Sequence, residues 1–226
     1  MEKNQKMIIW IEIILLMLAV LFYFLPMNGL NLDSIILLFF QETIRNPVLN
    51  PIFTGITTLG NAGAIWIILS ILLCIPKKTR RIGIISICAL LGSLLINNLI
   101  LKNLVGRIRP YEVLDGLVPL VAKPVDASFP SGHAGSSFAS GWVLFRNLPK
   151  RFGVPVLILA ILIACSRLYV GVHYPTDVLI GTMNGIAIAC LVQYLVEPLF
   201  RHQFPDLHAP DSAGNKVSEY KETDAD

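Results

Sequence analysis

Long apolar segments separated by short polar clusters make up the chain as far as about residue 196. A run of about 20 apolar residues is long enough to cross the hydrocarbon core of a bilayer as an α-helix. Runs near this length predict five membrane-spanning helices, at Met7–Leu25, Thr57–Ile75, Ile82–Leu101, Val154–Val170 and Val178–Val196. Residues 197–226 are more polar, and we expect them to form a tail without fixed structure.

A sixth span is predicted at His133–Phe145, although this segment is short and rich in glycine, serine and alanine. Gly132, Ser136 and Ser140 recur at four-residue spacing, so a helix would carry these small residues on one face. Such faces favour close packing between helices inside a bundle. The pattern therefore predicts an all-α integral membrane protein, with six transmembrane helices in one bundle formed by residues 1–196.

The basic clusters support this count, because short cytoplasmic loops of membrane proteins are enriched in lysine and arginine. Clusters stand at Lys77–Arg81 and Arg146–Arg151, and Lys3 and Lys6 precede the first span. With six spans, all three groups lie on the cytoplasmic side together with both termini. With five spans, the cluster Arg146–Arg151 would lie on the opposite side of the membrane from Lys77–Arg81, in conflict with the rule.

Three shorter features have predicted places but no predicted chemistry. Asp33–Arg45 starts with a residue that can cap a helix, and about a dozen residues suit an interfacial helix on the outer side. The first apolar run is too long for a cleaved signal peptide and lacks a small-residue cleavage site. Gly181 and Gly185 form a helix-contact pattern that suits internal packing and dimerisation equally.

Composition agrees with a membrane protein. Hydrophobic residues make up 54% of the chain and charged residues 15%, and the mean hydropathy of +0.67 excludes an ordinary soluble domain. The formal net charge of +3 indicates no particular partner, and we expect the lipid bilayer, not a nucleic acid. Four cysteines lie inside apolar runs without paired spacing, which predicts membrane-buried thiols: Cys74, Cys88, Cys165 and Cys190.

Three polar signatures stand at the ends of apolar runs. They are Lys102-x6-Arg109-Pro110, Pro130-Ser131-Gly132-His133 and Ser166-Arg167-x5-His173-x3-Asp177. In the six-span topology all three reach the outer membrane–water interface. Ionisable groups at membrane depth are costly, so their concentration here indicates function.

The first two signatures suit an anion. Pro110 disfavours helical backbone at Arg109 and so marks the end of the third span. Ser131 is a predicted helix N-cap, and Gly132 lets an anion approach the bare N–H groups of a helix N-terminus. His133 would lie in the first turn. Each signature also has a simpler interpretation. Lys102 and Arg109 could be cations that extend to the membrane interface, and the second signature could be a capped helix with an incidental surface histidine.

The third signature adds a histidine–carboxylate pair. Pro175 suits the first position of a helix, which leaves His173 just before the helix and Asp177 in its first turn. A carboxylate there can fix the tautomer of the imidazole, which is then available as a nucleophile. The alternative is a simple helix-capping hydrogen bond. Arg167 supplies a third cation.

In order and spacing the signatures resemble those of the type-2 phosphatidic acid phosphatase superfamily, K-x6-R-P, P-S-G-H and S-R-x5-H-x3-D. The resemblance covers about residues 1–196, and no motif residue is missing. It implies a metal-independent phosphomonoesterase or pyrophosphatase that works through a phosphohistidine and needs no cofactor. His173 would be the nucleophile, Asp177 its orienting partner and His133 the general acid. The phosphoryl oxygens would be held by Lys102, Arg109, Ser131, Gly132 and Arg167.

The chemistry of phosphoryl transfer agrees, because it needs mainly positioning and neutralisation of charge. Attack requires neutral His173 and protonated His133, which predicts a bell-shaped pH profile of kcat/KM. Two alternatives use the same residues differently. A lipid-phosphate binder or flippase would need the cations alone, and a metal hydrolase would use both histidines and Asp177 as ligands.

The predicted interfacial site favours a lipid-phosphate substrate. The candidates are undecaprenyl pyrophosphate, preferred narrowly, phosphatidylglycerophosphate and phosphatidic acid. The loop Tyr111–Phe129 is expected to shape the entrance, with Tyr111, Glu112 and Lys123 as candidates for headgroup selection. The sequence leaves the oligomeric state open.

Overall fold

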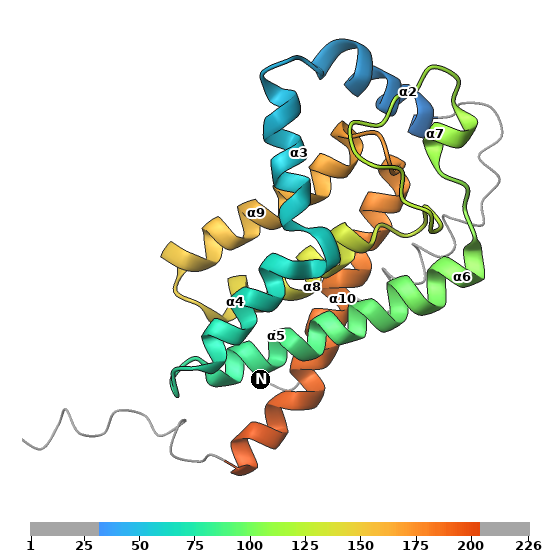
Figure 1. Ribbon diagram of the computed structural model, residues 1–226. Helices are drawn as coiled ribbons and strands as arrows, with labels where there is room; N and C mark the ends of the chain where they lie inside the picture. Colours follow the sequence, from blue (N-terminus) through green and yellow to red (C-terminus); the bar gives the residue numbers. More distant parts are fainter. Residues whose placement is uncertain (1–31, 204–226) are drawn as a thin grey trace, which may run out of the picture.

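The computed structural model describes residues 32–203, and within this range every regular element is helical (Figure 1). In chain order the elements are α2 (Leu32–Phe39), the π-helix η1 (Phe40–Ile44), α3 (Leu49–Leu59), the 3-10 helix η2 (Asn61–Gly63), α4 (Ala64–Cys74), α5 (Arg80–Ser93), the π-helix η3 (Leu94–Leu101), α6 (Lys102–Val105), α7 (Pro110–Val113), α8 (Gly132–Asn147), α9 (Lys150–Tyr169) and α10 (Pro175–Gln203). The predicted all-α class is confirmed for this part of the chain. The predicted first span, Met7–Leu25, lies outside the described residues.

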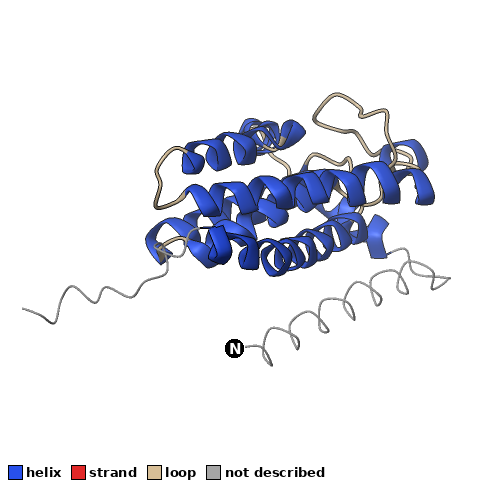
Figure 2. Ribbon diagram, turned by 90° about the horizontal axis from the view of Figure 1, so that it is seen from below, coloured by secondary structure: helices blue, strands red, loops and turns tan. Residues whose placement is uncertain are grey.

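Three helical segments are long and apolar enough to cross a bilayer: Arg80–Val113, Lys150–Tyr169 and Pro175–Val196. A fourth candidate consists of α3 and η2–α4, which meet at a bend of 48°. Figure 2 shows the long helices side by side in one bundle. The multi-pass character is thus supported, while a count of six spans stays a prediction.

The bend corrects the expectation of one uninterrupted helix at Thr57–Ile75. Ala62 has φ 51 and Gly63 has φ 70, so two consecutive residues adopt the left-handed conformation and interrupt the helix. The run Gly60-Asn61-Ala62-Gly63 holds residue types that are typical of a break, but the apolar residues on both sides of it gave the hydropathy of one continuous span. As a result, Gly60 and Asn61 project from the bend toward the start of α8.

The predicted short span forms α8, which packs against α9, α10 and α5. Its small residues allow close approach, as expected for a helix inside a bundle. A Cβ added at Gly181 or at Gly185 would lie 2.5 Å from the carbonyl oxygen of Ser131 or of Gly135, respectively. The Gly181–Gly185 pattern therefore serves the packing of α10 against α8.

Buried hydroxyl groups join α4, α5 and α8. The Ser86 Oγ lies 2.7 Å from the Oγ of Ser70 and 2.7 Å from that of Ser140. The Trp66 indole donates to the Oγ of Ser137 at 2.9 Å. Interhelical hydrogen bonds of this kind satisfy polar groups inside a membrane bundle and fix the position of α8. No disulfide joins the four cysteines, all of which lie within residues 32–203, as predicted; Cys165 is exposed and the others are partly buried.

The expected interfacial segment is helical, comprising α2 and η1, but the predicted N-cap is wrong. Asp33 lies in the first turn of α2, and its carboxylate accepts hydrogen bonds from Thr176, at 3.0 Å from the backbone N and 2.6 Å from Oγ1. Asp33 therefore satisfies the N-terminus of α10, a helix distant in sequence, and joins α2 to it.

Candidate active site

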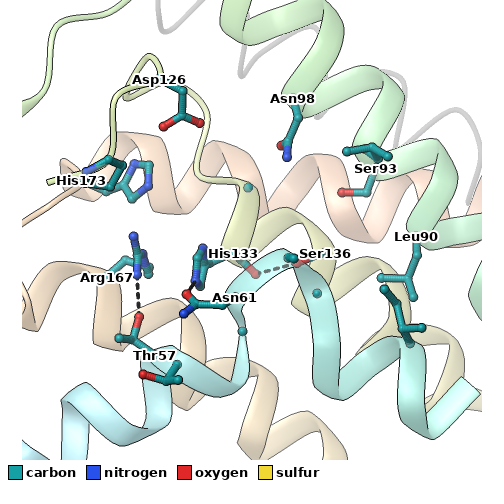
Figure 3. Close-up of a pocket in the computed structure, with 18 of the residues that line it drawn as sticks. Thr57, Asn61, Leu90, Ser93, Asn98, Asp126, His133, Ser136, Arg167 and His173 are labelled. Carbon is teal, nitrogen blue, oxygen red and sulfur yellow. Dashed lines mark hydrogen bonds between the residues drawn. The ribbon is translucent and has the colours of Figure 1, made fainter. Parts of the chain in front are cut away.

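A cavity of about 1100 Å³ lies between the bent α3–α4 pair and the continuous α5–η3 helix (Figure 3). At one end it is lined by residues of all three signatures: Lys102, Arg109, Gly132, His133, Arg167 and His173. The rest of the lining is mixed, with polar residues such as Thr58, Ser93 and Asn98 and an apolar wall that includes Ile67, Ile71, Ile87, Leu90, Leu91 and Leu94. The structure thus brings six of the predicted site residues around one space. Ser131 and Asp177 are buried behind them.

Asp177 is held rigidly next to His173. Its Oδ2 accepts hydrogen bonds from the Ser128 hydroxyl and from the backbone N–H of Tyr174, and its Oδ1 accepts one from Arg107 at 2.7 Å. His173 Nδ1 lies 3.5 Å from Asp177 Oδ2, which is slightly beyond hydrogen-bond length. The predicted pair is therefore present at the N-terminus of α10, with the carboxylate fixed before any ligand binds.

The contact with Arg109 identifies the tautomer of His173. Arg109 Nη1 lies 3.3 Å from His173 Nε2. Because a guanidinium group has donors only, Nε2 is the acceptor and carries the lone pair. The proton of the neutral ring therefore lies on Nδ1, facing Asp177. This is the arrangement in which Nε2 can act as a nucleophile toward a group bound in the cavity.

His173 is 1% exposed and lies in the loop before α10. Its pKa is lowered to about 4, chiefly because burial disfavours the charged ring. The contact with Asp177 raises the pKa, whereas the charges of Arg167 and Arg109 lower it. The imidazole is therefore neutral at pH 7.

Three buried cations, Lys102, Arg109 and Arg167, line the same end of the cavity. Arg167 Nη1 donates to Thr57 Oγ1 at 2.6 Å, while its Nε has no hydrogen-bond partner among residues 32–203. An unpaired donor on a buried cation is costly, and an anion in the cavity would remove that cost. The cavity is therefore suited to an anionic group.

The start of α8 has the predicted conformation. Ser131 is the N-cap, and its Oγ accepts a hydrogen bond from the Ala134 N–H at 3.4 Å. Gly132 follows as the first helical residue and lines the cavity. A Cβ at Gly132 would lie 2.7 Å from the side-chain oxygen of Asn98, so a larger residue here would displace the Asn98 side chain. The helix N-terminus thus adds backbone donors to the three cations.

His133 lies in the first turn of α8, against the bend between α3 and α4. Its Nε2 is hydrogen-bonded to Asn61 Oδ1 at 3.1 Å (Figure 3). A Cβ added at Gly60 would lie 2.7 Å from His133 Cδ2, so the bend packs directly on the ring. The sequence gave Asn61 no role, because the bend that positions it was not predicted.

Arg107 is a second residue that sequence reasoning missed. Its guanidinium joins Asp33 Oδ2 and Asp177 Oδ1, each at 2.7 Å, and lies 3.8 Å from the centroid of the Tyr174 ring. The sequence did hold a signal for it: Arg107 is a cation near the end of a predicted span, two residues before Arg109, and such a residue is costly unless it has a function. Arg107 thus connects α2 to the carboxylate that faces His173.

The loop Tyr111–Phe129 contributes to the cavity wall, as expected, through Leu120, Val121, Ala122, Pro124 and Asp126. The three residues suggested for headgroup selection do not line it, and the Lys123 ammonium instead lies 5.4 Å from the Tyr111 ring. The loop residue that reaches the cations is Asp126, which contacts both Lys102 and Arg109.

The PAP2 superfamily model matches residues 81–201, a segment that includes all three signatures. An undecaprenyl-diphosphatase of Sulfolobus acidocaldarius is 35% identical over 127 residues, which cover 56% of this chain and 61% of that protein. Undecaprenyl-diphosphatase BcrC of Bacillus subtilis is 33% identical over 167 residues, covering 74% of this chain and 80% of that protein. The chain therefore spans less than two thirds of the archaeal relative.

A solved structure is similar as well. The crystal structure of a transmembrane PAP2 type phosphatidylglycerolphosphate phosphatase from Bacillus subtilis aligns with a TM-score of 0.64 and 28% sequence identity. The alignment covers 83% of this chain and 94% of that one.

Proposed function

This chain belongs to the PAP2 superfamily, and from that premise we propose that it hydrolyses a lipid phosphate or pyrophosphate through a phosphohistidine. The observation that carries the proposal is the state of His173. A buried, neutral imidazole with its lone pair on Nε2 lines a cavity next to three cations. A protein that only binds phosphate needs the cations but not an oriented nucleophile.

In the proposed first step, His173 Nε2 forms a bond to phosphorus while the bond to the leaving oxygen breaks. His133 donates a proton to that oxygen. The three cations and the α8 N-terminus stabilise the charge on the other phosphoryl oxygens. In the second step, a water oxygen attacks phosphorus, His133 accepts the proton of the water, and the phosphorus–nitrogen bond breaks to release phosphate.

The shape of the cavity supports a lipid substrate. Four residues of its apolar wall are also exposed on the protein surface, between 43% and 59%: Ile67, Ile71, Leu91 and Leu94. An acyl or prenyl chain can lie along this wall while its phosphate reaches the cations. Undecaprenyl pyrophosphate is the first candidate, since two relatives carry the name undecaprenyl-diphosphatase. Phosphatidylglycerophosphate and phosphatidic acid are the others.

We place the site on the outer face and both termini in the cytoplasm. The basic clusters Lys77–Arg81 and Arg146–Arg151 support this orientation. α5 begins within the first cluster and runs on toward Lys102, and α8 begins at the cavity and ends at the second. The clusters therefore lie at the opposite helix ends from the site, as the positive-inside rule requires of an outward-facing site.

The function is tested by phosphate release from the three lipids, using purified protein in detergent micelles that contain a chelator. We expect release from all three, fastest from undecaprenyl pyrophosphate. Loss of release on chelation would favour the metal hydrolase. Absence of release with phosphate binding retained would favour the lipid-phosphate binder.

The pH dependence of kcat/KM tests the state of His173. Because its pKa is about 4, the ring stays neutral as pH falls to that value and becomes protonated, and therefore unreactive, below it. We expect the acid limb due to His173 near pH 4, not near the ordinary histidine value of about 6.5. Two substrates with different phosphate pKa values separate this limb, which stays fixed, from the limb of the substrate, which moves. A fixed limb near pH 6.5 would contradict the assignment.

A further inference from the structure

The carboxylate of Asp126 forms ion pairs with two of the cations that line the cavity. Its Oδ1 accepts a hydrogen bond from Arg109 Nη2 at 2.6 Å, and its Oδ2 contacts Lys102 Nζ. The side chain of Asp126 is 51% exposed, whereas those of Lys102 and Arg109 are 8% and 3% exposed. In Figure 3, Asp126 stands above His173, on the opposite side of the ring from Arg167.

The guanidinium of Arg109 is saturated with acceptors in this state. Nε donates to the Asp126 carbonyl oxygen, and Nη1 faces the Val172 carbonyl oxygen and His173 Nε2. Nη2 donates to Asp126 Oδ1 and to the Ala127 carbonyl oxygen. Five N–H groups thus have five acceptors. A phosphoryl oxygen can bind Arg109 only by replacing one of them.

The Asp126 carboxylate is the acceptor best placed for replacement. It is the only charged one of the five, its side chain is half exposed, and it also contacts Lys102. The other acceptors are three backbone carbonyl oxygens and the proposed nucleophile. An anion that binds Lys102 and Arg109 together therefore takes the position that the carboxylate now holds.

We propose that Asp126 is a resident counter-anion, which occupies the phosphate position of the free protein and is displaced when phosphate binds. The identity of the displacing anion rests on the proposed function. Burial alone would raise the pKa of Asp126, but the hydrogen bonds and charges of Lys102 and Arg109 lower it to about 2. The carboxylate is therefore ionised near neutral pH.

This exchange sets how tightly the cavity holds phosphate. Buried cations without a counter-charge are costly, so Asp126 stabilises the empty site. Phosphate must compete with that interaction, which weakens the binding of substrate and product alike. The product then dissociates more readily than it would from three unpaired cations.

The test is direct binding of inorganic phosphate, measured by calorimetry on the full-length wild type, Asp126→Asn and Asp126→Ala. We expect both variants to bind phosphate about tenfold more tightly, because removing the competing charge strengthens attraction of the anion. Asp115→Asn is the matched control, since Asp115 is an exposed carboxylate of the same loop that does not line the cavity. Its phosphate affinity should stay within about twofold of wild type.

Unchanged or weaker phosphate binding in both Asp126 variants would overturn the proposal. Tighter phosphate binding cannot result from damage to the fold. If the asparagine side chain still forms hydrogen bonds with the cations, the alanine variant, which cannot, still tests the proposal. Phosphate release from lipid by the wild type is measured in parallel. Release with unchanged affinity in the variants overturns only the role of Asp126. A wild type that neither binds phosphate nor releases it overturns the proposed function.

Discussion

Replacing His173 with alanine is expected to lower kcat for lipid-phosphate hydrolysis by about 10⁴-fold or more. The substitution removes the atom that would attack phosphorus. It leaves the three cations in place, so binding of phosphate should persist. The measurement is phosphate release in micelles, with calorimetric phosphate binding by the same variant as the control for its fold.

A second readout identifies the intermediate. Rapid denaturation of the wild type during turnover of a labelled substrate should trap phosphate on the protein as a phosphoramidate, which is stable in alkali and labile in acid. The variant should trap none. A variant that keeps more than about a tenth of the wild-type kcat would exclude His173 as the nucleophile.

Replacing Arg107 with methionine is expected to lower both stability and activity. Asp33 and Asp177 are 6% and 0% exposed, and each would lose the cation that neutralises it. Removing one partner of a buried ion pair typically costs about 3–5 kcal/mol. The 24% exposure of the Arg107 side chain places the expected loss at the lower end of that range. Thermal and denaturant unfolding in micelles measure it.

The effect on the reaction distinguishes positioning of Asp177 from general stability. Without Arg107, the negative charge of Asp177 acts more strongly on His173, and the acid limb of kcat/KM should move upward from about pH 4. The charged and titratable groups around Arg107 are Asp33 on α2, Asp177 on α10 and Tyr174. We expect kcat/KM to fall about 100-fold, with partial recovery in Arg107→Lys.

Arg146→Met is the matched control for Arg107. It removes an exposed arginine at the other end of α8 and should leave both the unfolding free energy and the acid limb unchanged. If Arg107→Met destabilises the protein without moving the acid limb, Arg107 holds the fold together but does not set the state of Asp177.

The sequence predicted those parts of the site whose backbone conformation depends on local residue preferences. Ser131 caps α8, Pro175 starts α10, and Arg109 has extended backbone before Pro110, all as expected. These are local preferences for capping and for the first turn, which operate in any fold. They place both histidines at helix starts without knowledge of tertiary structure.

What the sequence could not predict depends on partners far away along the chain. Asp33 was expected to cap its own helix, but Arg107, 74 residues away, and Thr176, 143 residues away, bind its carboxylate. The break at Ala62 was missed because the span was assigned from hydropathy, although Gly60, Asn61 and Gly63 are residue types that favour an interruption. Asn61 reaches His133 because of that bend, and Asp126 reaches the cations because of the path of the loop Tyr111–Phe129. Neither contact could be predicted from the spacing of residues in the sequence.

The glycine contacts between α8 and α10 have a consequence for how such a protein can diversify. Main chain lies against main chain at Gly181 and Gly185, and the two helices begin beside His133 and His173. The separation of the proposed acid and the proposed nucleophile is thereby built into a part of the molecule that has almost no side-chain freedom. The part of the cavity wall formed by α4 and α5 consists mainly of aliphatic side chains. Substitutions in that wall can therefore change the fit of a lipid tail without altering the separation of the two histidines.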